Sequence, residues 1–498
     1  MRLSLARATL ASAAAQGAGM VFTVLATPYL IHSLGVEPYG VFAVVAVLGS
    51  QLTALQLGIA SAVPRRLAET RAGGDAGEHA ATVVSAWWLS ALAALLVLAA
   101  FVLVAPAAWA RALHASPAVL GMARSALPPA AAVVALQPLV ATSYAILIGE
   151  ERFGRLSALR TVHGVVRVGA AVLVVAAGGG LGAVLWGQAA VDLAALVAVA
   201  ASGPIRLLRG AAGALRPASW RLLALGIPFA GADLINSLLL DAEKIAVGLA
   251  GSIADFTYYT VPFAAVMRLT LLAAVLSSLL VPKLARMAEE GDTAGSARLT
   301  HQATRMLTAS MALLVAPLIG VAPQLLGVWV GADFATRSGL VARVLLVALV
   351  INSSVYAAHA AVRARAPARV LPMLYAAELG VHLACVFFAV RYWGIVGAAA
   401  AWGFRASIDA VAQRGLAERA LGASVGRWRE CVVPAGALAA FAVACHHFGA
   451  AAPWWIGLGA GAALGLGIAA WLSEADDLDV VGRALGLGGA LRFARGAA

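Results

Sequence analysis

The chain has 498 residues, of which 62% are hydrophobic and 12% charged, and its formal net charge is +12. Soluble domains carry about 25% charged residues, so the composition excludes an ordinary soluble enzyme. The positive charges are scattered over short segments between apolar runs, which argues against nucleic acid as a partner. Apolar runs of about 20 residues recur along the chain and predict an all-α polytopic membrane protein.

Fourteen apolar segments are predicted to cross the bilayer. The first follows Arg2 and Arg7 and is longer than the core of a cleaved signal peptide, so we expect it to be retained as a span. Prolines interrupt the fourth and seventh segments, which membrane helices tolerate where neighbouring groups satisfy the backbone. The expected spans are 9–31, 40–63, 82–104, 127–148, 161–178, 181–202, 221–241, 257–281, 302–321, 339–362, 371–390, 394–413, 432–448 and 454–472.

The basic residues predict the orientation of these spans. If the N-terminus is cytoplasmic, 25 of the 35 lysines and arginines fall in cytoplasmic segments and four fall outside. The other six lie within spans or at their edges. This bias follows the positive-inside rule, and fourteen spans return the C-terminus to the cytoplasm as well.

Two parts of the chain resemble each other at a nearly constant offset. Tyr39 and Tyr258 open spans 2 and 8, and Pro64 and Pro282 close them, at offsets of 219 and 218 residues. The offset contains six spans, an even number, so the two copies are expected to be parallel repeats. The predicted organisation is an N-terminal lobe of spans 1–6 (1–210), a C-terminal lobe of spans 7–12 (211–425), spans 13–14 (426–473) and a cytoplasmic tail (474–498).

The first hairpin contains the runs TPYLIHSLGVEPYGVFAV and LGIASAVPRRLAE. This pattern resembles the oligosaccharide flippases of the MOP superfamily, the Wzx-type polysaccharide biosynthesis or O-antigen transporter family. The second half follows a similar order, but it has Tyr-Tyr-Thr where the family has Tyr-Gly. The matching residues are Pro28, Leu34, Gly35, Tyr39, Gly40, Gly58 and Arg65, and then Asp241, Gly251, Tyr258 or Tyr259, and Pro282.

The resemblance implies a two-lobed, V-shaped helix bundle with alternating access. It implies that the chain moves an undecaprenyl-pyrophosphate-linked oligosaccharide across the bacterial inner (plasma) membrane, for O-antigen, capsule or exopolysaccharide synthesis. The coupling ion would be H⁺ or Na⁺, and polysaccharide polymerase or assembly proteins would be partners. Two alternatives in the same superfamily stay open: a lipid II flippase of peptidoglycan synthesis and a multidrug/cation antiporter.

The sequence gives no indication of an enzyme or of a bound cofactor. Neither Lys244 nor Lys283 stands in a P-loop, so no ATP site is expected on this chain. The longest external segment, 105–126, holds no nucleophile with a base, no metal cluster and no carboxylate pair. Asp477 and Asp479 lie in a tail without a nucleotide-binding domain around them, and the three cysteines lie in or beside apolar runs. Neither set is expected to bind a metal.

Ionisable residues inside membrane spans are candidates for function. In span 7, Asp233, Asp241 and Lys244 share one helical face with Asn236 and Ser237. A polar face on an apolar helix is expected to line a cavity. There the two aspartates are candidates for ion coupling, and Lys244 is a candidate for binding an anionic substrate. The alternative is that Asp241 and Lys244 pair with each other at the outer interface.

Span 8 carries Arg268 near its middle, with no acidic residue three or four positions away. An isolated arginine at the centre of a span costs about 2.5–3.5 kcal/mol on insertion scales, so Arg268 needs an anion. Its planar fork suits the pyrophosphate of the substrate. The alternative partner is an aspartate on a neighbouring helix.

Two further pairs stand four positions apart, so the members of each lie one turn apart on a helix. Arg405 and Asp409 of span 12 either neutralise each other or leave Arg405 to bind substrate. Glu378 and His382 of span 11 either relay protons for ion coupling or only hold helices together.

Spans 5 and 6 carry charges at a similar depth. Span 5 contains His163 and Arg167, and span 6 contains Asp192. We expect Arg167 and Asp192 mainly to form a buried pair. Arg167 is then a secondary candidate for binding the substrate.

Overall fold

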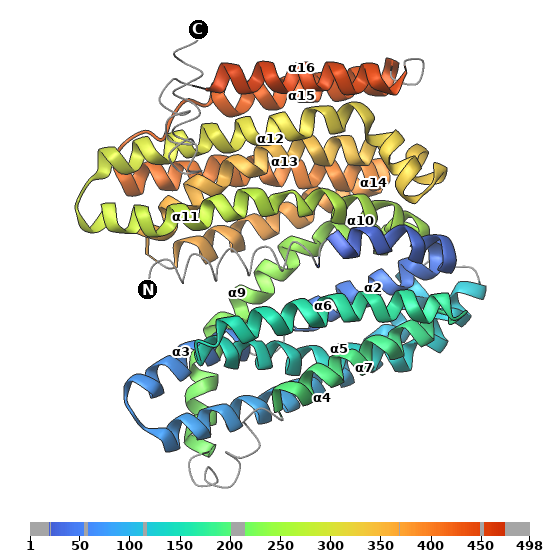
Figure 1. The fold of residues 1–498 in the computed structure, drawn as a ribbon, viewed down its shortest axis with the longest axis vertical. Helices are drawn as coiled ribbons and strands as arrows, with labels where there is room; N and C mark the ends of the chain where they lie inside the picture. The colour runs from blue at the N-terminus through green and yellow to red at the C-terminus, as the bar shows by residue number, and fades with distance from the viewer. Residues whose placement is uncertain are drawn as a thin grey trace. The chain divides into compact units, whose positions relative to one another are not determined.

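The structure is a computed structural model, and within its described ranges the chain is all-helical and contains no strand (Figure 1). Eleven of its helices are long and apolar enough to cross a membrane by length and composition. The all-α polytopic membrane fold expected from the composition is therefore confirmed. The described ranges are 19, 21–53, 58–112, 117–200, 215–367, 369–448 and 453–473.

The chain divides into two compact units, Met1–Thr260 and Val261–Ala498. The first unit opens with a short apolar helix, Val21–Leu34. Its further helices are α2 (Val36–Thr53), α3 (Ile59–Ala72), α4 (Ala76–Ala112), α5 (Pro117–Gly149), α6 (Phe153–Ala176), α7 (Leu181–Ala200), α9 (Leu215–Ala250) and the first half of α10 (Ile253–Arg268).

The second unit continues from within α10. In Figure 1, α15 and α16 run alongside α12, against which both pack. The further helices of this unit are α11 (Thr270–Glu289), α12 (Thr293–Val330), α13 (Ala332–Arg365), α14 (Val370–Leu421), α15 (Arg429–Phe448) and α16 (Trp454–Leu472).

Within the described residues, every predicted span coincides with helix, but three spans are not single continuous rods. Span 2 is divided into α2 and α3 at Gly58, whose φ of 65° is left-handed. A Cβ at Gly58 would also collide with the backbone carbonyl of Gly226 in α9. Glycine is therefore required both by the left-handed backbone conformation and by the close approach of α9. Span 8 is divided into α10 and α11 at Leu269. Spans 11 and 12 form one element, α14, interrupted by non-helical angles at Gly394.

The helices recur in the same order at a similar spacing, which agrees with the repeat. The elements α2 to α7 correspond to α10 to α14, where α14 contains the counterparts of both α6 and α7. Three of the corresponding pairs begin 217 residues apart, and the pairs α3 and α11 and α5 and α13 begin at slightly shorter offsets. The paired starts are Val36 and Ile253 for α2 and α10, Ala76 and Thr293 for α4 and α12, and Phe153 and Val370 for α6 and α14.

Helix α9 opens the second copy of the repeat, yet it packs within the first unit. It lies against α2, α3 and α4. The unit boundary after Thr260 therefore differs from the predicted lobe boundary after residue 210, because the units follow packing and the lobes follow the repeat. The lobes 1–210 and 211–425 and the segment 426–473 stay a prediction, and the tail 474–498 lies outside the described residues.

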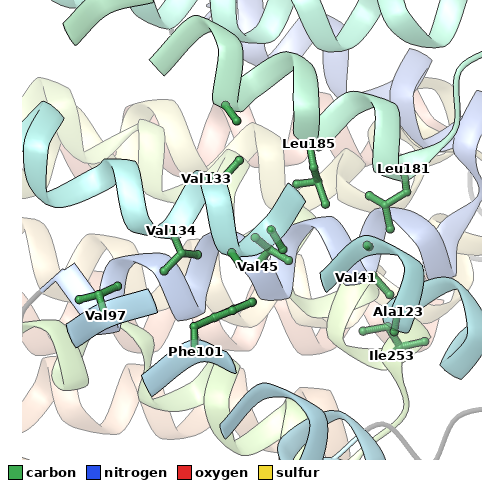
Figure 2. Close-up of a cluster of buried hydrophobic side chains, with 14 residues drawn as sticks. Val41, Val45, Val97, Phe101, Ala123, Val133, Val134, Leu181, Leu185 and Ile253 are labelled. Atoms are coloured by element: carbon green, nitrogen blue, oxygen red, sulfur yellow. The ribbon is translucent and has the colours of Figure 1, made fainter. Parts of the chain in front are cut away.

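The core of the first unit is apolar and centred on α5. Buried side chains from α2, α4, α5, α7 and the start of α10 meet there, among them Phe101, Leu185 and Ile253 (Figure 2). In a bilayer this packing is stabilised by close van der Waals fit rather than by exclusion of water. The core therefore fixes the backbone from which the polar side chains of α6 and α7 project.

The second unit is stabilised by close packing of helix backbones and by a hydrogen bond from a buried arginine. Gly320 of α12 and Gly457 of α16 lie backbone to backbone, so a Cβ on either would meet the other's main chain. The buried Arg343 of α13 donates from Nε to the carbonyl oxygen of Ile319 at 3.1 Å. That carbonyl lacks a helical donor because Pro323, four residues later, has no N–H. Arg343 thus has a structural partner.

Candidate functional site

The ionisable side chains within the spans gather in three groups, and each group lies within one unit. We name them after the helix that supplies their buried carboxylate. They are the α9 cluster (Ser50, Gln51, Asp241 and Lys244), the α7 cluster (Tyr144, His163, Arg167 and Asp192) and the α14 cluster (His359, Glu378, Arg405, Asp409 and Gln413).

In the α9 cluster, the carboxylate of Asp241 accepts hydrogen bonds from three side chains and is buried. Lys244 Nζ donates to Oδ1 at 2.5 Å from the next turn of the helix. Ser50 Oγ and Gln51 Nε2 of α2 donate to Oδ2, each at 2.8 Å. The polar face of α9 is therefore turned toward the first hairpin, and the pairing of Asp241 with Lys244 that was the structural alternative is formed.

Asp233 lies two turns before Asp241 on the same helix but is exposed within the unit. It accepts a hydrogen bond from Ser61 Oγ of α3 at 3.0 Å. Glu243 lies off the polar face by its spacing, yet it is completely buried. Helical spacing gives the direction of a side chain but not the neighbour that covers it, so nothing in the sequence indicated this burial.

In the α7 cluster, two side chains converge on Asp192, which is fully buried. His163 Nε2 lies 2.7 Å from Asp192 Oδ1, and Arg167 Nε lies 3.3 Å from the same oxygen. His163 Nδ1 lies 2.7 Å from the hydroxyl of Tyr144 in α5. The expected pair of Arg167 and Asp192 is formed, and the imidazole extends it into a chain that links α5, α6 and α7.

In the α14 cluster, the two arms of one element bring two carboxyl groups into electrostatic contact. Glu378 of the first arm and Asp409 of the second are 4% and 6% exposed, and Arg405 is the cation beside Glu378. Gln413 Nε2 donates to Asp409 Oδ1 at 2.7 Å, while Gln413 Oε1 lies 3.0 Å from His359 Nδ1 of α13. The cluster therefore contains two neighbouring acids and one arginine, which lies beside Glu378.

The pairs expected from four-residue spacing in α14 have different outcomes. No ion pair joins Arg405 to Asp409 among the described residues, so their self-neutralisation is not observed. Glu378 and His382 lie one turn apart, and both are buried. Whether this second pair relays protons stays a prediction.

Arg268 is the last residue of α10 and lies next to the break at Leu269. Its Nη1 donates to the carbonyl oxygen of Ala264, in its own helix, at 2.8 Å. Arg268 belongs to the second unit, and the aspartates of α9 belong to the first. Its binding of an anionic head group stays a prediction.

The repeat contains a signal that the individual motifs do not. Asp192 and Asp409 are 217 residues apart, the spacing at which whole helices recur. Each copy of the repeat thus places one buried aspartate at the same point, in α7 and in the second arm of α14. Tyr144, His359 and Gln413, which complete the two clusters, carry no such signal in the sequence.

None of the three clusters has the composition of a metal centre. Across the part of the chain that the structure describes, no group of three or more histidine, cysteine, aspartate or glutamate side chains is placed to hold a metal ion. The clusters combine carboxylates with cations, amides and hydroxyls, which suits binding of protons, small cations or anionic groups.

Comparison with known proteins gives one family and a distant relative. A family model described as polysaccharide biosynthesis protein matches residues 33–337, more than half of the chain. A candidate O-antigen transporter of Shigella flexneri is 22% identical over 179 residues. That match covers 36% of this chain and 39% of the relative, so the chain matches about two fifths of the relative's length.

Solved transporter structures share the fold. The lipid II flippase MurJ, in an inward closed conformation, superposes with a TM-score of 0.69 at 12% identity, covering 97% of this chain and 99% of its own. An inward-facing multidrug resistance transporter of the MATE family, in the MOP superfamily, also has a TM-score of 0.69, at 14% identity, covering 81% and 94%. At such identities the likeness establishes the arrangement of helices and leaves the substrate open.

Proposed function

Because the chain belongs to the polysaccharide biosynthesis protein family, we propose that it is a flippase for an undecaprenyl-pyrophosphate-linked oligosaccharide. It would move this lipid from the inner to the outer leaflet of the bacterial inner membrane, with both termini cytoplasmic. The family match from residue 33 to 337 carries this proposal, because it runs through the opening of both copies of the repeat. Polymerase or assembly proteins that receive the sugar outside are the expected partners.

The proposed substrate has three parts that require different surroundings. Its pyrophosphate is anionic and suits arginine, whose guanidinium donates paired hydrogen bonds to phosphate oxygens. Its sugars suit amide and hydroxyl groups, and its polyprenyl chain stays in lipid. A protein that carries it therefore needs cations within its spans, where every uncompensated charge is costly.

The four proposed substrate-binding cations differ in how firmly they are engaged. Lys244 and Arg167 each lie against a buried aspartate. Arg405 Nε has no hydrogen-bond partner among the described residues and lies beside the Glu378 carboxyl. Arg268 ends α10 beside the break at Leu269 and donates to a carbonyl oxygen of its own helix. We therefore assign the first contact with pyrophosphate to Arg268 and Arg405.

Ion coupling is assigned mainly to the α14 cluster. Two neighbouring buried carboxyl groups beside one arginine would carry an excess negative charge if both were ionised, and a proton or Na⁺ would neutralise it. Binding of that ion would release Arg405 for the anionic substrate, so the ion and the substrate would be coupled through one side chain. His382, Asp233 and Asp241 are the further candidates for the same role.

The proposal is tested by deleting the gene and measuring surface polysaccharide and lipid-linked sugar. We expect surface polysaccharide to fall and the lipid-linked intermediate to accumulate. Arg268→Ala and Arg405→Ala should fail to restore export, Arg268→Lys and Arg405→Lys should restore part of it, and the exposed Arg391→Ala should restore it fully.

Two results would contradict the proposal. Full rescue by both alanine variants would show that the two arginines do not bind the substrate. If depletion of the protein left surface polysaccharide normal but caused loss of viability and accumulation of cell-wall precursor, the chain would be assigned to peptidoglycan synthesis. Drug sensitivity of the deletion strain with normal polysaccharide would instead indicate an antiporter.

A further inference from the structure

The α7 cluster contains a buried carboxylate oxygen without a hydrogen bond. Asp192 is 0% exposed, and its Oδ2 has no partner among the described residues, while Oδ1 contacts both His163 and Arg167. Burying an ionised carboxylate costs free energy unless its oxygens are satisfied. A proton on Oδ2 removes the charge and that cost together.

Arg167 is held at Asp192 by charge rather than by a directed hydrogen bond. Its Nε lies 3.3 Å from Oδ1, but the N–H does not point at the oxygen, and Nε has no other partner among the described residues. The Arg167 side chain is 28% exposed, whereas that of Asp192 is 0% exposed. The guanidinium therefore lies at the edge of the cluster, where it can turn away once the carboxylate loses its charge.

Among the described residues, the helices discussed below place no other carboxylate against Asp192. Helix α6 contributes His163, Arg167 and Arg160, the last of which lies over the Tyr144 ring at 5.0 Å. Helix α5 contributes Tyr144, whose charged neighbours are Arg160, Asp192 and Arg167. Helix α2 also packs against α7, and its ionisable residues, Glu37 and Tyr39, lie in its first turn. The charge of Arg167 is thus balanced by Asp192.

From this geometry we propose that Asp192 binds one proton and that its neutralisation releases Arg167 to bind a phosphate group. The inference rests on the proposed function, for which it places a proton-gated anion site in the first unit. With His163 neutral, its Nε2–H donates to Oδ1 and its Nδ1 accepts from the Tyr144 hydroxyl. One proton from the aqueous phase then adds to Oδ2, no other bond forms or breaks, and the net charge of the cluster rises from zero to +1 on Arg167.

The repeat gives this inference an independent basis. Asp409, at the position of Asp192 in the second copy, is also buried. Arg405 lies beside the neighbouring acid, Glu378, and is 217 residues from Gln188, which is buried in α7. Both copies therefore place a buried aspartate at this point, in a cluster that also contains an arginine, although the two arginines lie on different helices.

The test measures binding of geranyl pyrophosphate to the full chain in lipid nanodiscs at pH 6 and pH 8. Each variant is compared with the wild type at the same pH, so that ionisation of the probe cancels. We expect Asp192→Asn to bind about fivefold or more tightly than the wild type at pH 8 and the difference to be smaller at pH 6, since a coupling free energy of 1–3 kcal/mol corresponds to about 5–150-fold.

Further variants separate gating from folding. Arg167→Gln should bind more weakly than the wild type at both pH values, and the double variant with Asp192→Asn should match Arg167→Gln. The exposed Arg152→Gln, at the start of α6, should bind as the wild type does. The melting temperature of each variant identifies any that fails to fold, and the double variant still tests the inference if one single variant is unstable.

Three outcomes would overturn the inference. They are weaker binding by Asp192→Asn at pH 8, unchanged binding by Arg167→Gln, and a wild type that does not bind the probe. The deletion strain tests the proposed flippase function separately. If that strain lacks surface polysaccharide but these variants bind the probe as the wild type does, the flippase function stands and only the gating of Arg167 is contradicted.

Discussion

Asp192 and Asp409 occupy the same place in the two copies of the repeat, but their surroundings differ in charge. Asp192 faces His163 and Arg167, so the acid is matched by a cation. Asp409 faces a second acid, Glu378, and Arg405 lies beside Glu378. The first cluster has one acid for its arginine, whereas the second has two acids and one arginine.

This difference shows what a repeat specifies and what it leaves free. Helix lengths and spacing are repeated because they determine how the backbone packs in the membrane. The partners of a buried carboxylate are set by a few side chains, which change without disturbing that packing. Two copies of one scaffold therefore provide two ion sites with different charge balance, and these sites respond differently to the same substitution.

The largest effect is expected from removing the excess negative charge in the α14 cluster. Glu378→Gln combined with Asp409→Asn keeps the side-chain shapes and abolishes ion binding there, so we expect export to fall about tenfold or more, within the range typical of coupling between two sites. Accumulation of the lipid-linked intermediate in cells measures this. The exposed Glu290→Gln is the matched control, and export at the wild-type level in the double variant would refute ion coupling at this cluster.

The second effect concerns stability. Arg405→Gln leaves the Glu378 carboxyl, which also neighbours Asp409, without its cation, and breaking a buried charge group typically costs about 3–5 kcal/mol. Thermal unfolding of the purified protein should show a lower melting temperature. Adding Glu378→Gln to Arg405→Gln should restore most of the loss, because one of the two uncompensated charges is then removed. A melting temperature that falls further in the double variant would show that Arg405 does not balance Glu378.

A smaller effect is expected at Asp241, the buried carboxylate of the α9 cluster. Its oxygens are satisfied by Lys244, Ser50 and Gln51, unlike Asp192, whose Oδ2 has no partner among the described residues, so we expect Lys244 to contribute to stability. Lys244→Met leaves the two α2 donors in place and should lower the free energy of unfolding by about 1–3 kcal/mol. Chemical denaturation measures it, with Lys283→Met as the control. Export lost without any loss of stability would instead make Lys244 a substrate ligand.

The smallest effect is expected outside the membrane, at Glu69. Its ion pairs are exposed, so they serve as a reference for the buried clusters. Hydrogen bonds from Arg66 and then Arg65 hold the pKa of the Glu69 carboxyl below its ordinary value. Its contribution to stability is therefore fully present above the ordinary pKa and is lost as the pH falls through the lowered one. Glu69→Gln should cost less than about 1 kcal/mol at pH 7, as exposed ion pairs do, and nothing at acidic pH. A larger loss at acidic pH than at pH 7 would contradict this sign.

Much of the fold could be predicted from the sequence, because spans of apolar residues and a constant offset are one-dimensional signals. The offset between Tyr39 and Tyr258 already indicated the repeat, and its spacing agrees with the helix starts. The break at Gly58 was not predicted, since it depends on the close approach of Gly226 from a helix far along the chain. Packing of α9 within the first unit was not predicted either, because spacing along a chain does not say which neighbour a helix chooses.

The candidate site was predicted only in part. The pairing of Arg167 with Asp192 followed from similar depth in adjacent spans, and the pairing of Asp241 with Lys244 followed from helical spacing. The convergence of Glu378 and Asp409 depends on how the two arms of α14 fold back at Gly394. The spacing of four residues on one helix instead predicts an ion pair between Arg405 and Asp409. Among the described residues this pair is not formed, because neighbours from other parts of the fold compete for the same carboxylate.

The backbone contact between Gly320 and Gly457 has a practical consequence for watching this protein move. Two helices that touch main chain to main chain cannot slide without collision, so α16 follows α12 as a rigid attachment. Leu466 and Trp471 of α16 point away from the unit and are 59% and 50% exposed. A spin label or fluorophore at either position would report the motion of the second unit through the transport cycle while leaving all three charge clusters untouched.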